Sequence, residues 1–129
     1  MSIVVIDSVG WIAYFKGDSL TNSYRHHILR QSDIVCPSIV IYEVSKKIEL
    51  QVSRQAAAMA VAQLVKNRVV ALDQSVATSA ARVSIEHGLA MADAIIYATS
   101  LIAGATLLTS DAHFQDLPHV QFVPRDSKV

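Results

Sequence analysis

Three aspartates stand directly after short apolar runs, where the carboxyl end of a strand is expected. Asp7 follows IVVI, Asp73 follows VVAL and Asp111 follows TLLTS. Because the carboxyl ends of parallel strands meet at one edge of a sheet, acids placed there can converge on a divalent cation. Each aspartate also has a simpler explanation: Asp7 and Asp73 as helix N-caps, and Asp111 as a turn residue. Taken singly, their positions leave capping and metal binding open.

Asp93 lies in the first turn of a helix expected over 90–103, just before a strand expected at 106–109. There it could simply compensate the positive end of the helix dipole. Tyr97 and Ser100 follow at i+4 and i+7, so the three side chains form one polar stripe along an otherwise apolar helix. A stripe that faces water and a stripe that lines a groove below a metal site both fit this spacing.

Glu43 lies in the middle of a helix expected over 39–50, and Lys46 and Lys47 follow it at i+3 and i+4. The default explanation is an ion pair on a solvated helix face. The alternative is that Glu43 joins the aspartates, in which case the two lysines lie one turn further along the helix and are placed to hold an anion.

The elements that would position these acids alternate between strands and helices. Short β-branched or apolar runs predict strands, and longer segments with apolar residues at helical spacing predict helices. We expect strands at 3–6, 34–36, 69–72, 106–109 and 120–123, and helices at 9–15, 21–30, 39–50 with Ser38 as N-cap, 53–66, 90–103 and a segment that Asp73 or Ser75 caps and Gly88 ends. This alternation predicts an α/β fold with a mostly parallel central sheet. No linker-like segment divides the chain, which predicts one domain, residues 1–129.

Composition excludes several classes of protein. With 129 residues, 52% of them apolar and 17% charged, the chain can bury a core and is not disordered. Lysines and arginines (11) balance aspartates and glutamates (11), so any surface for nucleic acid must be local. The lone cysteine, Cys36, lies in the run IVCP and is expected to be a buried structural thiol. No apolar run approaches the ~20 residues of a membrane span, so we expect a soluble, cytoplasmic protein with no membrane partner.

Four segments together resemble the signature blocks of the PIN domain in order and spacing: VVIDSVGWIAYF, PSIVIYEVSKKI, LAMADAIIYATSLIAGATLLTSD and the HF-x-D-L stretch that follows. The resemblance covers residues 3 to about 123 and is closest to small bacterial VapC-like toxins of type II toxin–antitoxin pairs. It implies a three-layer α/β/α fold whose acids bind Mg²⁺ or Mn²⁺. Carried over by motif, the catalytic and metal-binding acids are Asp7, Glu43, Asp93 and Asp111, and the hydroxyls of Ser8 and Thr109 orient the carboxylates or a metal-bound water.

One position departs from the pattern of the PIN domain. Many relatives carry an Asp before the Phe of the last block, and this chain has His113 before Phe114. Asp111 must then serve as the fourth acid alone or with Asp116, which is itself expected to be a surface or turn residue. His113 either contacts a scissile phosphate or is merely exposed.

The resemblance implies a metal-dependent endoribonuclease that acts as the toxin of a toxin–antitoxin pair and hydrolyses phosphodiester bonds in tRNA or ribosomal RNA. A metal-activated water would attack in line and leave a 5′-phosphate and a 3′-hydroxyl. The implied partners are the RNA substrate, a cognate antitoxin protein and a second copy of the chain in a homodimer. The patch from Trp11 to Phe15 either packs in the core or lies at one of these interfaces. Candidate RNA-binding residues are Lys46, Lys47, Arg25 and Arg82, with Arg30 and Arg54 as further basic side chains.

Two rival interpretations remain. A receiver-like phosphoacceptor domain has a similar size and also places acids at strand ends, and Asp73 would then be the acceptor. Against it, the paired acids after the first strand and the lysine after the last strands of that family are absent. The second rival is a catalytically inactive PIN scaffold that only binds RNA or protein, against which the intact acids argue. Metal titration, RNA cleavage and acetyl-phosphate labelling would separate the three.

Overall fold

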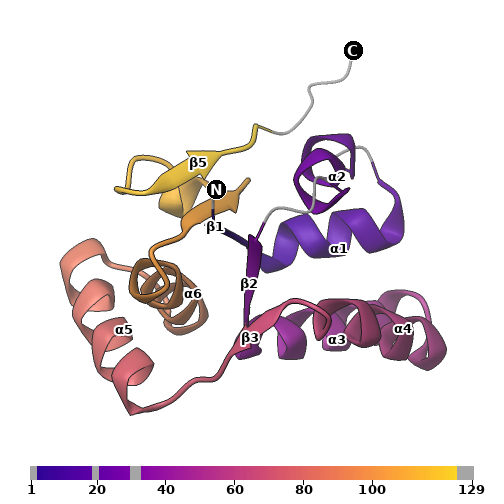
Figure 1. The fold of residues 1–129 in the computed structure, drawn as a ribbon, viewed down its shortest axis with the longest axis horizontal. Coiled ribbons are helices and arrows are strands. Elements are labelled where there is room, and N and C mark those ends of the chain that lie inside the picture. The colour runs from indigo at the N-terminus through magenta and orange to yellow at the C-terminus, as the bar shows by residue number, and fades with distance from the viewer. Residues whose placement is uncertain (1–2, 19–20, 30–32, 125–129) are drawn as a thin grey trace.

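A computed structural model describes residues 3–18, 21–29 and 33–124 of the chain (Figure 1). The described strands form one sheet in the order β3-β2-β1-β4-β5, and every pairing between neighbours is parallel. This confirms the predicted α/β class with its parallel sheet. The strands are β1 (Ile3–Ile6), β2 (Asp33–Pro37), β3 (Arg68–Val70), β4 (Thr106–Thr109) and β5 (Val120–Phe122).

Helices cover both faces of the sheet, which gives the expected three layers. In the view of Figure 1, α5 and α6 lie at the lower left of the molecule and α1 to α4 at its right, with β1 and β2 between the two groups. The helices are α1 (Ser8–Lys16), α2 (Thr21–Leu29), α3 (Ser38–Gln51), α4 (Arg54–Leu64), α5 (Gln74–His87) and α6 (Met91–Ile102), followed after β4 by a 3₁₀ turn, η1 (Ala112–Phe114). None of these helices is long and apolar enough to span a membrane.

Two predicted element boundaries are wrong for one physical reason. The strand expected at 69–72 ends at Val70, because the N–H of Leu72 donates to the Ser38 side chain at 3.2 Å instead of to a neighbouring strand. Ser38 therefore accepts this bond from the loop and is not the N-cap of α3. The cap position falls to Pro37, which offers no side-chain bond. Arg30, expected at the end of the second helix, lies outside the described residues.

The core lies between the sheet and its two helix layers. β1 and β4 are the central pair, and Val5, Ile6 and Leu108 are fully buried in it. The face of α3 formed by Val40, Val44 and Ile48 is also buried, as its spacing predicts. Cys36 is buried in β2, and burial raises the pKa of its thiol to about 12, so it is a structural residue.

The polar stripe expected along α6 is not a groove lining. Tyr97 is 1% exposed and donates its hydroxyl to the Pro118 carbonyl at 2.8 Å. Ser100 is fully buried and donates to the carbonyl of Tyr97 at 2.7 Å. A short hydroxyl side chain can donate its hydrogen bond to a carbonyl of the preceding helical turn. A polar residue on this helix is therefore not evidence that its face contacts water or a ligand. Asp93 alone of the three reaches the site described below.

The apolar patch from Trp11 to Phe15 is only partly in the core. Trp11 is 2% exposed and stacks on Phe15, with their ring centroids 5.7 Å apart. Ile12, Tyr14 and Phe15 are only partly buried. The core interpretation therefore holds for Trp11, and the rest of the patch reaches the surface.

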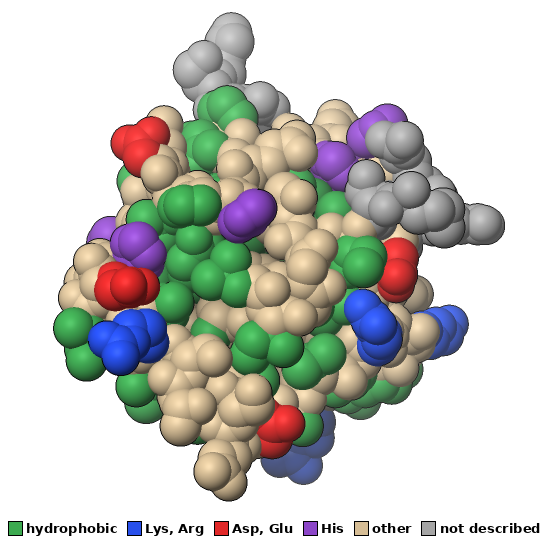
Figure 2. Space-filling model, turned by 60° about the vertical axis from the view of Figure 1, so that its left-hand side comes forward, with side chains coloured by type: hydrophobic (Ala, Val, Ile, Leu, Met, Phe, Trp, Pro, Cys, Tyr) green, Lys and Arg blue, Asp and Glu red, His purple; other side chains and the backbone are tan. Residues whose placement is uncertain are grey.

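Charge is spread thinly over the surface that Figure 2 shows. Lysine, arginine and acidic side chains are scattered over this face, in places next to one another, and no broad basic area forms on it. This agrees with the neutral overall charge of the sequence.

Candidate active site at the carboxyl edge of the sheet

Asp7 joins the end of β1 to the start of α1 and is held on both carboxylate oxygens. Its Oδ1 accepts the Gly10 backbone N–H at 3.0 Å, which makes it the N-cap of α1. Its Oδ2 accepts the Thr109 hydroxyl. The residue is only 3% exposed. Asp7 is therefore the cap that the sequence allowed, and it is also fixed against the end of β4.

Burial raises the pKa of Asp7 to about 6, although both hydrogen bonds oppose the shift. The negative charges of Asp111 and Asp93 raise it further. The same two causes act on Asp93, because burial and the charge of Asp111 raise its pKa, with a smaller contribution from Glu43. Like charges gathered away from water resist joint ionisation, so this cluster retains a proton more readily than free carboxylates do.

Thr109 and the residues after it tie the end of β4 to β1. The Thr109 hydroxyl donates to Asp7 and accepts the Asp111 backbone N–H at 2.9 Å. One hydroxyl therefore sets the positions of two acids that lie about a hundred residues apart in the chain. A hydroxyl bonded to a carboxylate in this way can orient it, which is the role that the resemblance implies for Thr109 and which stays a prediction.

Asp111 caps η1 and faces Asp93. Its Oδ1 accepts the His113 backbone N–H at 2.9 Å and lies 3.0 Å from Nδ1 of the same residue. The His113 Nδ1 is also 3.8 Å from Oδ2 of Asp93. The His113 side chain is 76% exposed, so it closes the cluster on the solvent side. His113 therefore occupies the place between two acids where many relatives are expected to carry a third.

Asp93 reaches this edge because α6 runs against β4. Only a short turn separates the end of α6 from the start of β4, and the two elements pack together. A helix that ends at the amino edge of the sheet must begin near its carboxyl edge when it is at least as long as the strand. The first turn of α6, with Asp93, therefore lies beside the residues that follow β1 and β4.

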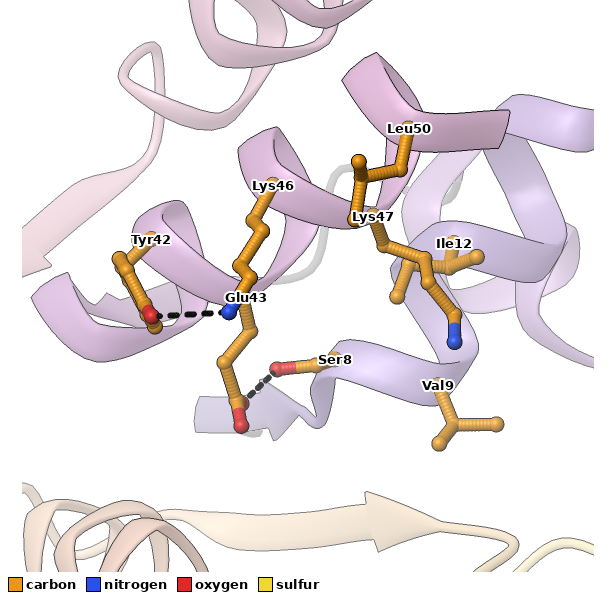
Figure 3. A pocket seen from close by; sticks show the side chains of 8 residues that line it. All are labelled: Ser8, Val9, Ile12, Tyr42, Glu43, Lys46, Lys47 and Leu50. Atoms are coloured by element: carbon orange, nitrogen blue, oxygen red, sulfur yellow. Dashed lines mark hydrogen bonds between the residues drawn. The ribbon is translucent and has the colours of Figure 1, made fainter. Parts of the chain in front are cut away.

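Glu43 enters the site from α3 and not through its lysines. Its Oε1 accepts the Ser8 hydroxyl at 2.5 Å, and Figure 3 shows its carboxylate directed at the start of α1. Within the described part of the chain, neither Lys46 nor Lys47 makes an ion pair with a carboxylate. The expected i+3 or i+4 pairing is therefore wrong, and Ser8 orients Glu43 as the resemblance implied.

The remaining predicted residues are dispersed. Asp73 is exposed and caps α5, with Oδ1 accepting the Val76 N–H at 2.9 Å. Asp116 is exposed in the turn after η1. Arg25 on α2 is exposed, and no described contact joins it to the acids. Arg82 lines a separate hollow between α5 and α6. Their proposed roles in the site therefore receive no support from the geometry.

Two supporting contacts were missed at the level of sequence. Gly10 allows α1 to pack closely, since a Cβ there would lie 2.5 Å from Cε1 of Tyr24. Tyr24 in turn shares a hydrogen bond of 2.6 Å between its hydroxyl and Ser110 Oγ. The glycine stands three residues after Asp7 and could have been identified as a close approach. A bond between positions 24 and 110 leaves no pattern in the sequence.

The donor set fits a divalent cation. One ligand atom from each of Asp93, Asp111 and His113 can be chosen so that all three lie within 4.8 Å of one another. Two oxygen ligands on opposite sides of one Mg²⁺ or Ca²⁺ are about 4 to 5 Å apart, so these atoms can share one ion. Asp7 and Glu43 lie outside that triplet: the charges of Asp111 and Asp93 raise the pKa of Asp7, and the charge of Glu43 contributes to raising the pKa of Asp93. The edge can therefore concentrate positive charge next to a bound anion.

Comparison with known proteins gives the same fold. No curated protein matches the sequence. A toxin–antitoxin complex from Klebsiella pneumoniae is 21% identical with a TM-score of 0.77, and the match covers 92% of this chain and 95% of that one. VapC20 from Mycobacterium tuberculosis, described as a sarcin-ricin loop cleaving toxin, is 17% identical with a TM-score of 0.76, covering 93% and 96%. DNA-bound VapBC from Salmonella typhimurium is 15% identical with a TM-score of 0.75, covering 96% and 98%. The model of the PIN domain family matches residues 4–120 of the sequence, and the chain belongs to that family.

Proposed function

We propose that this protein is a metal-dependent endoribonuclease and the toxin of a toxin–antitoxin pair. The observation that carries the proposal is the convergence of four acids, from four separate segments, at one edge of the sheet. Phosphodiesters are anionic and would be repelled by these acids. A cation bound between the acids and the substrate removes that repulsion. The solved structures with the same fold include a toxin that cleaves the sarcin-ricin loop, which supports ribosomal RNA as the substrate, and the resemblance of the sequence blocks adds tRNA as the alternative.

Asp93 and Asp111 would hold Mg²⁺ or Mn²⁺ most directly, with His113 on the exposed side and Asp7 on the buried side. When bound, such an ion supplies positive charge to the phosphodiester oxygens and lowers the pKa of a water molecule. The protein does the positioning. Thr109 and the Gly10 N–H hold Asp7, and Ser8 holds Glu43, so these carboxylates keep their directions without the ion. We also propose that residues 1–129 form one nuclease domain.

The partners follow from the same comparisons. The Klebsiella pneumoniae structure is a toxin–antitoxin complex and the Salmonella typhimurium structure is VapBC bound to DNA, so we expect a cognate antitoxin here and a cytoplasmic setting. A homodimer is supported by large apolar side chains that α5 and α6 expose to solvent: Ile85 is 79%, Met91 75% and Ile102 49% exposed. Family membership rules out the receiver-like interpretation. The inactive PIN scaffold is the outcome that the following experiment can reveal.

The test is cleavage of total RNA and of tRNA by purified protein with Mg²⁺, with Mn²⁺ and with chelator. Wild-type protein should cleave with either ion and not with chelator, and Asp93→Asn should be inactive. Absence of cleavage by wild-type protein under all ionic conditions would leave the inactive scaffold as the better description. Equal cleavage by wild type and Asp93→Asn would contradict the site.

A further inference from the structure

We propose that a groove between α1 and α3 binds the nucleotide next to the scissile phosphate, with Tyr42 as the platform for its base and Lys46 and Lys47 as the contacts for its phosphates. This inference rests on the nuclease function proposed above. It adds a subsite for single-stranded RNA and names the residues that would decide how tightly the strand is held.

The groove has the size and the walls of a nucleotide site. Its volume is about 400 Å³, within the about 300 to 1000 Å³ that ligand sites occupy. Val9, Ile12 and Leu50 supply apolar walls, and Tyr42, Lys46 and Lys47 supply an aromatic ring and two cations (Figure 3). Such a combination of an apolar floor with a few charged groups is suited to a ligand that has a flat base and an anionic backbone.

The groove opens directly onto the acids. Ser8 and Glu43 line it, and they are the pair joined by the 2.5 Å hydrogen bond. Glu43 is itself one of the four acids, and its charge contributes to raising the pKa of Asp93. A strand that leaves the acidic edge past Glu43 therefore enters this groove.

The two lysines are available to an external anion. Tyr42 and Lys46 lie one helical turn apart on α3, and Lys47, the next residue along, points toward Ile12 and Val9 of α1 at the other side of the groove (Figure 3). Lys46 Nζ lies 3.4 Å from the Tyr42 hydroxyl and 5.6 Å from the centre of its ring. Within the described residues, neither ammonium group is paired with a carboxylate, although Glu43 is on the same helix. The ammonium groups of Lys46 and Lys47 are therefore placed beside the acidic site where they can bind the phosphates of an RNA strand.

The ring of Tyr42 favours RNA over an acidic peptide. Tyr42 is 60% exposed, and its hydroxyl and ring lie beside Lys46. An exposed aromatic face next to cations is the arrangement on which bases of single strands stack while the backbone follows the positive charges. An acidic peptide would need the lysines and would gain little from the ring.

The experiment measures binding of a single-stranded oligoribonucleotide of about ten nucleotides to protein in the inactive Asp93→Asn background, as a function of salt. The double variant Lys46→Gln/Lys47→Gln should bind about 10-fold or more weakly, and its salt slope should fall by about 1.4, because each phosphate contact to a single strand contributes about 0.7. Tyr42→Ala should weaken binding about 5- to 100-fold, and Tyr42→Phe should bind like the parent. In the Asp93-containing protein, these variants should raise KM with little change in kcat.

A matched control removes two charges at the opposite edge of the sheet. Lys66 and Arg68 are exposed where β3 begins, so Lys66→Gln/Arg68→Gln should bind and cleave like the parent protein. Groove variants that bind RNA as tightly as this control would overturn the proposal. Cleavage of RNA by the wild-type protein would then still support the nuclease function. Loss of binding to a polyglutamate peptide with unchanged RNA binding would also overturn it, in favour of a protein-docking groove. Wild-type protein that neither binds nor cleaves RNA would remove both proposals.

Discussion

Asp7 and Asp73 occupy equivalent helix-capping positions, but Asp7 is buried and Asp73 is exposed. Each follows a parallel strand, each starts a helix, and each accepts a backbone N–H from the residue three positions on, at 3.0 Å and 2.9 Å. Asp7 is 3% exposed and influenced by two other carboxylates, whereas Asp73 is exposed. β1 is the middle strand of the sheet and β3 is an edge strand. The helix-capping role explains Asp73 completely and leaves the burial of Asp7 unexplained.

The difference shows what distinguishes a cap from a site. A cap needs one oxygen and tolerates water, so an exposed position costs nothing. Asp7 uses its second oxygen on Thr109 and lies among charges that raise its pKa, which is unfavourable for folding. A buried carboxylate that destabilises the protein is a feature expected where function requires it. The predictions below test this contrast.

The largest effect should be on RNA cleavage. Asp7→Asn keeps the shape and the helix cap but removes the charge, so cleavage should fall by roughly 1000-fold or more. Asp73→Asn makes the same change at the edge strand and should cleave like wild type. The measurement is the initial rate on one RNA at saturating Mg²⁺. Similar losses in both variants would mean that burial does not separate the two aspartates.

The next effect is on stability in the absence of metal. The pKa of Asp7 is about 6 in the folded protein against a reference of 3.8, so the folded state binds the proton more tightly than the unfolded state. The stability that Asp7 contributes is therefore fully present below about pH 4 and is lost as the pH rises through 6. By pH 8 the ionised Asp7 lowers the free energy of unfolding by about 3 kcal/mol relative to low pH.

Asp7→Asn should remove this cost and be more stable than wild type at pH 8, with the advantage disappearing near pH 4. Asp73→Asn should follow the wild-type profile. Denaturant unfolding in chelator at several pH values measures both. An Asp7→Asn protein that is less stable than wild type at pH 8 would show that the carboxylate is not strained by its surroundings.

A smaller effect should appear in metal binding. An imidazole nitrogen suits first-row transition ions better than Mg²⁺. His113→Ala should therefore weaken Mn²⁺ binding about 10-fold and change Mg²⁺ binding less. Calorimetric titration without RNA measures both affinities, and Asp73→Asn, which changes the capping region only, should titrate like wild type. Unchanged Mn²⁺ affinity would exclude His113 from the ligand set.

The smallest effect concerns the cap itself. Asp73→Ala should lower the free energy of unfolding by about 1 kcal/mol and leave metal binding and cleavage unchanged. Ser53→Ala is a matched case, because Ser53 caps α4 by accepting the Ala56 N–H at 2.9 Å. Equal losses in the two variants would show that Asp73 is an ordinary cap, and a loss of cleavage in Asp73→Ala would not fit.

Most of the fold could be predicted because local patterns decide it. The strands at 3–6 and 106–109 have the expected bounds, since continuous apolar runs are suited to buried parallel strands. Gly88 ends α5 in the left-handed conformation that its position indicated. β3 was less well predicted because its end depends on a bond from Leu72 to a side chain 34 positions away.

The site was only partly predictable, since its decisive contacts are long-range. The motif named Glu43 and gave Ser8 an orienting role, but it did not say which carboxylate Ser8 would bond, and helix spacing favoured the neighbouring lysines as the partners of Glu43. The stripe along α6 misled because Ser100 bonds to its own helix. The sequence shows that His113 departs from the family pattern, but the position of its ring between two acids depends on the packing of α6 against the turn after β4.

The central claim is that the acidic edge binds a divalent cation, and crystals grown with Mn²⁺ test it most directly. We predict an anomalous peak in contact with carboxylate oxygens of Asp93 and Asp111, beside Asp7 and within reach of His113. A structure from active, Mn²⁺-containing protein with no peak at this edge, or with a peak only elsewhere, would contradict the account.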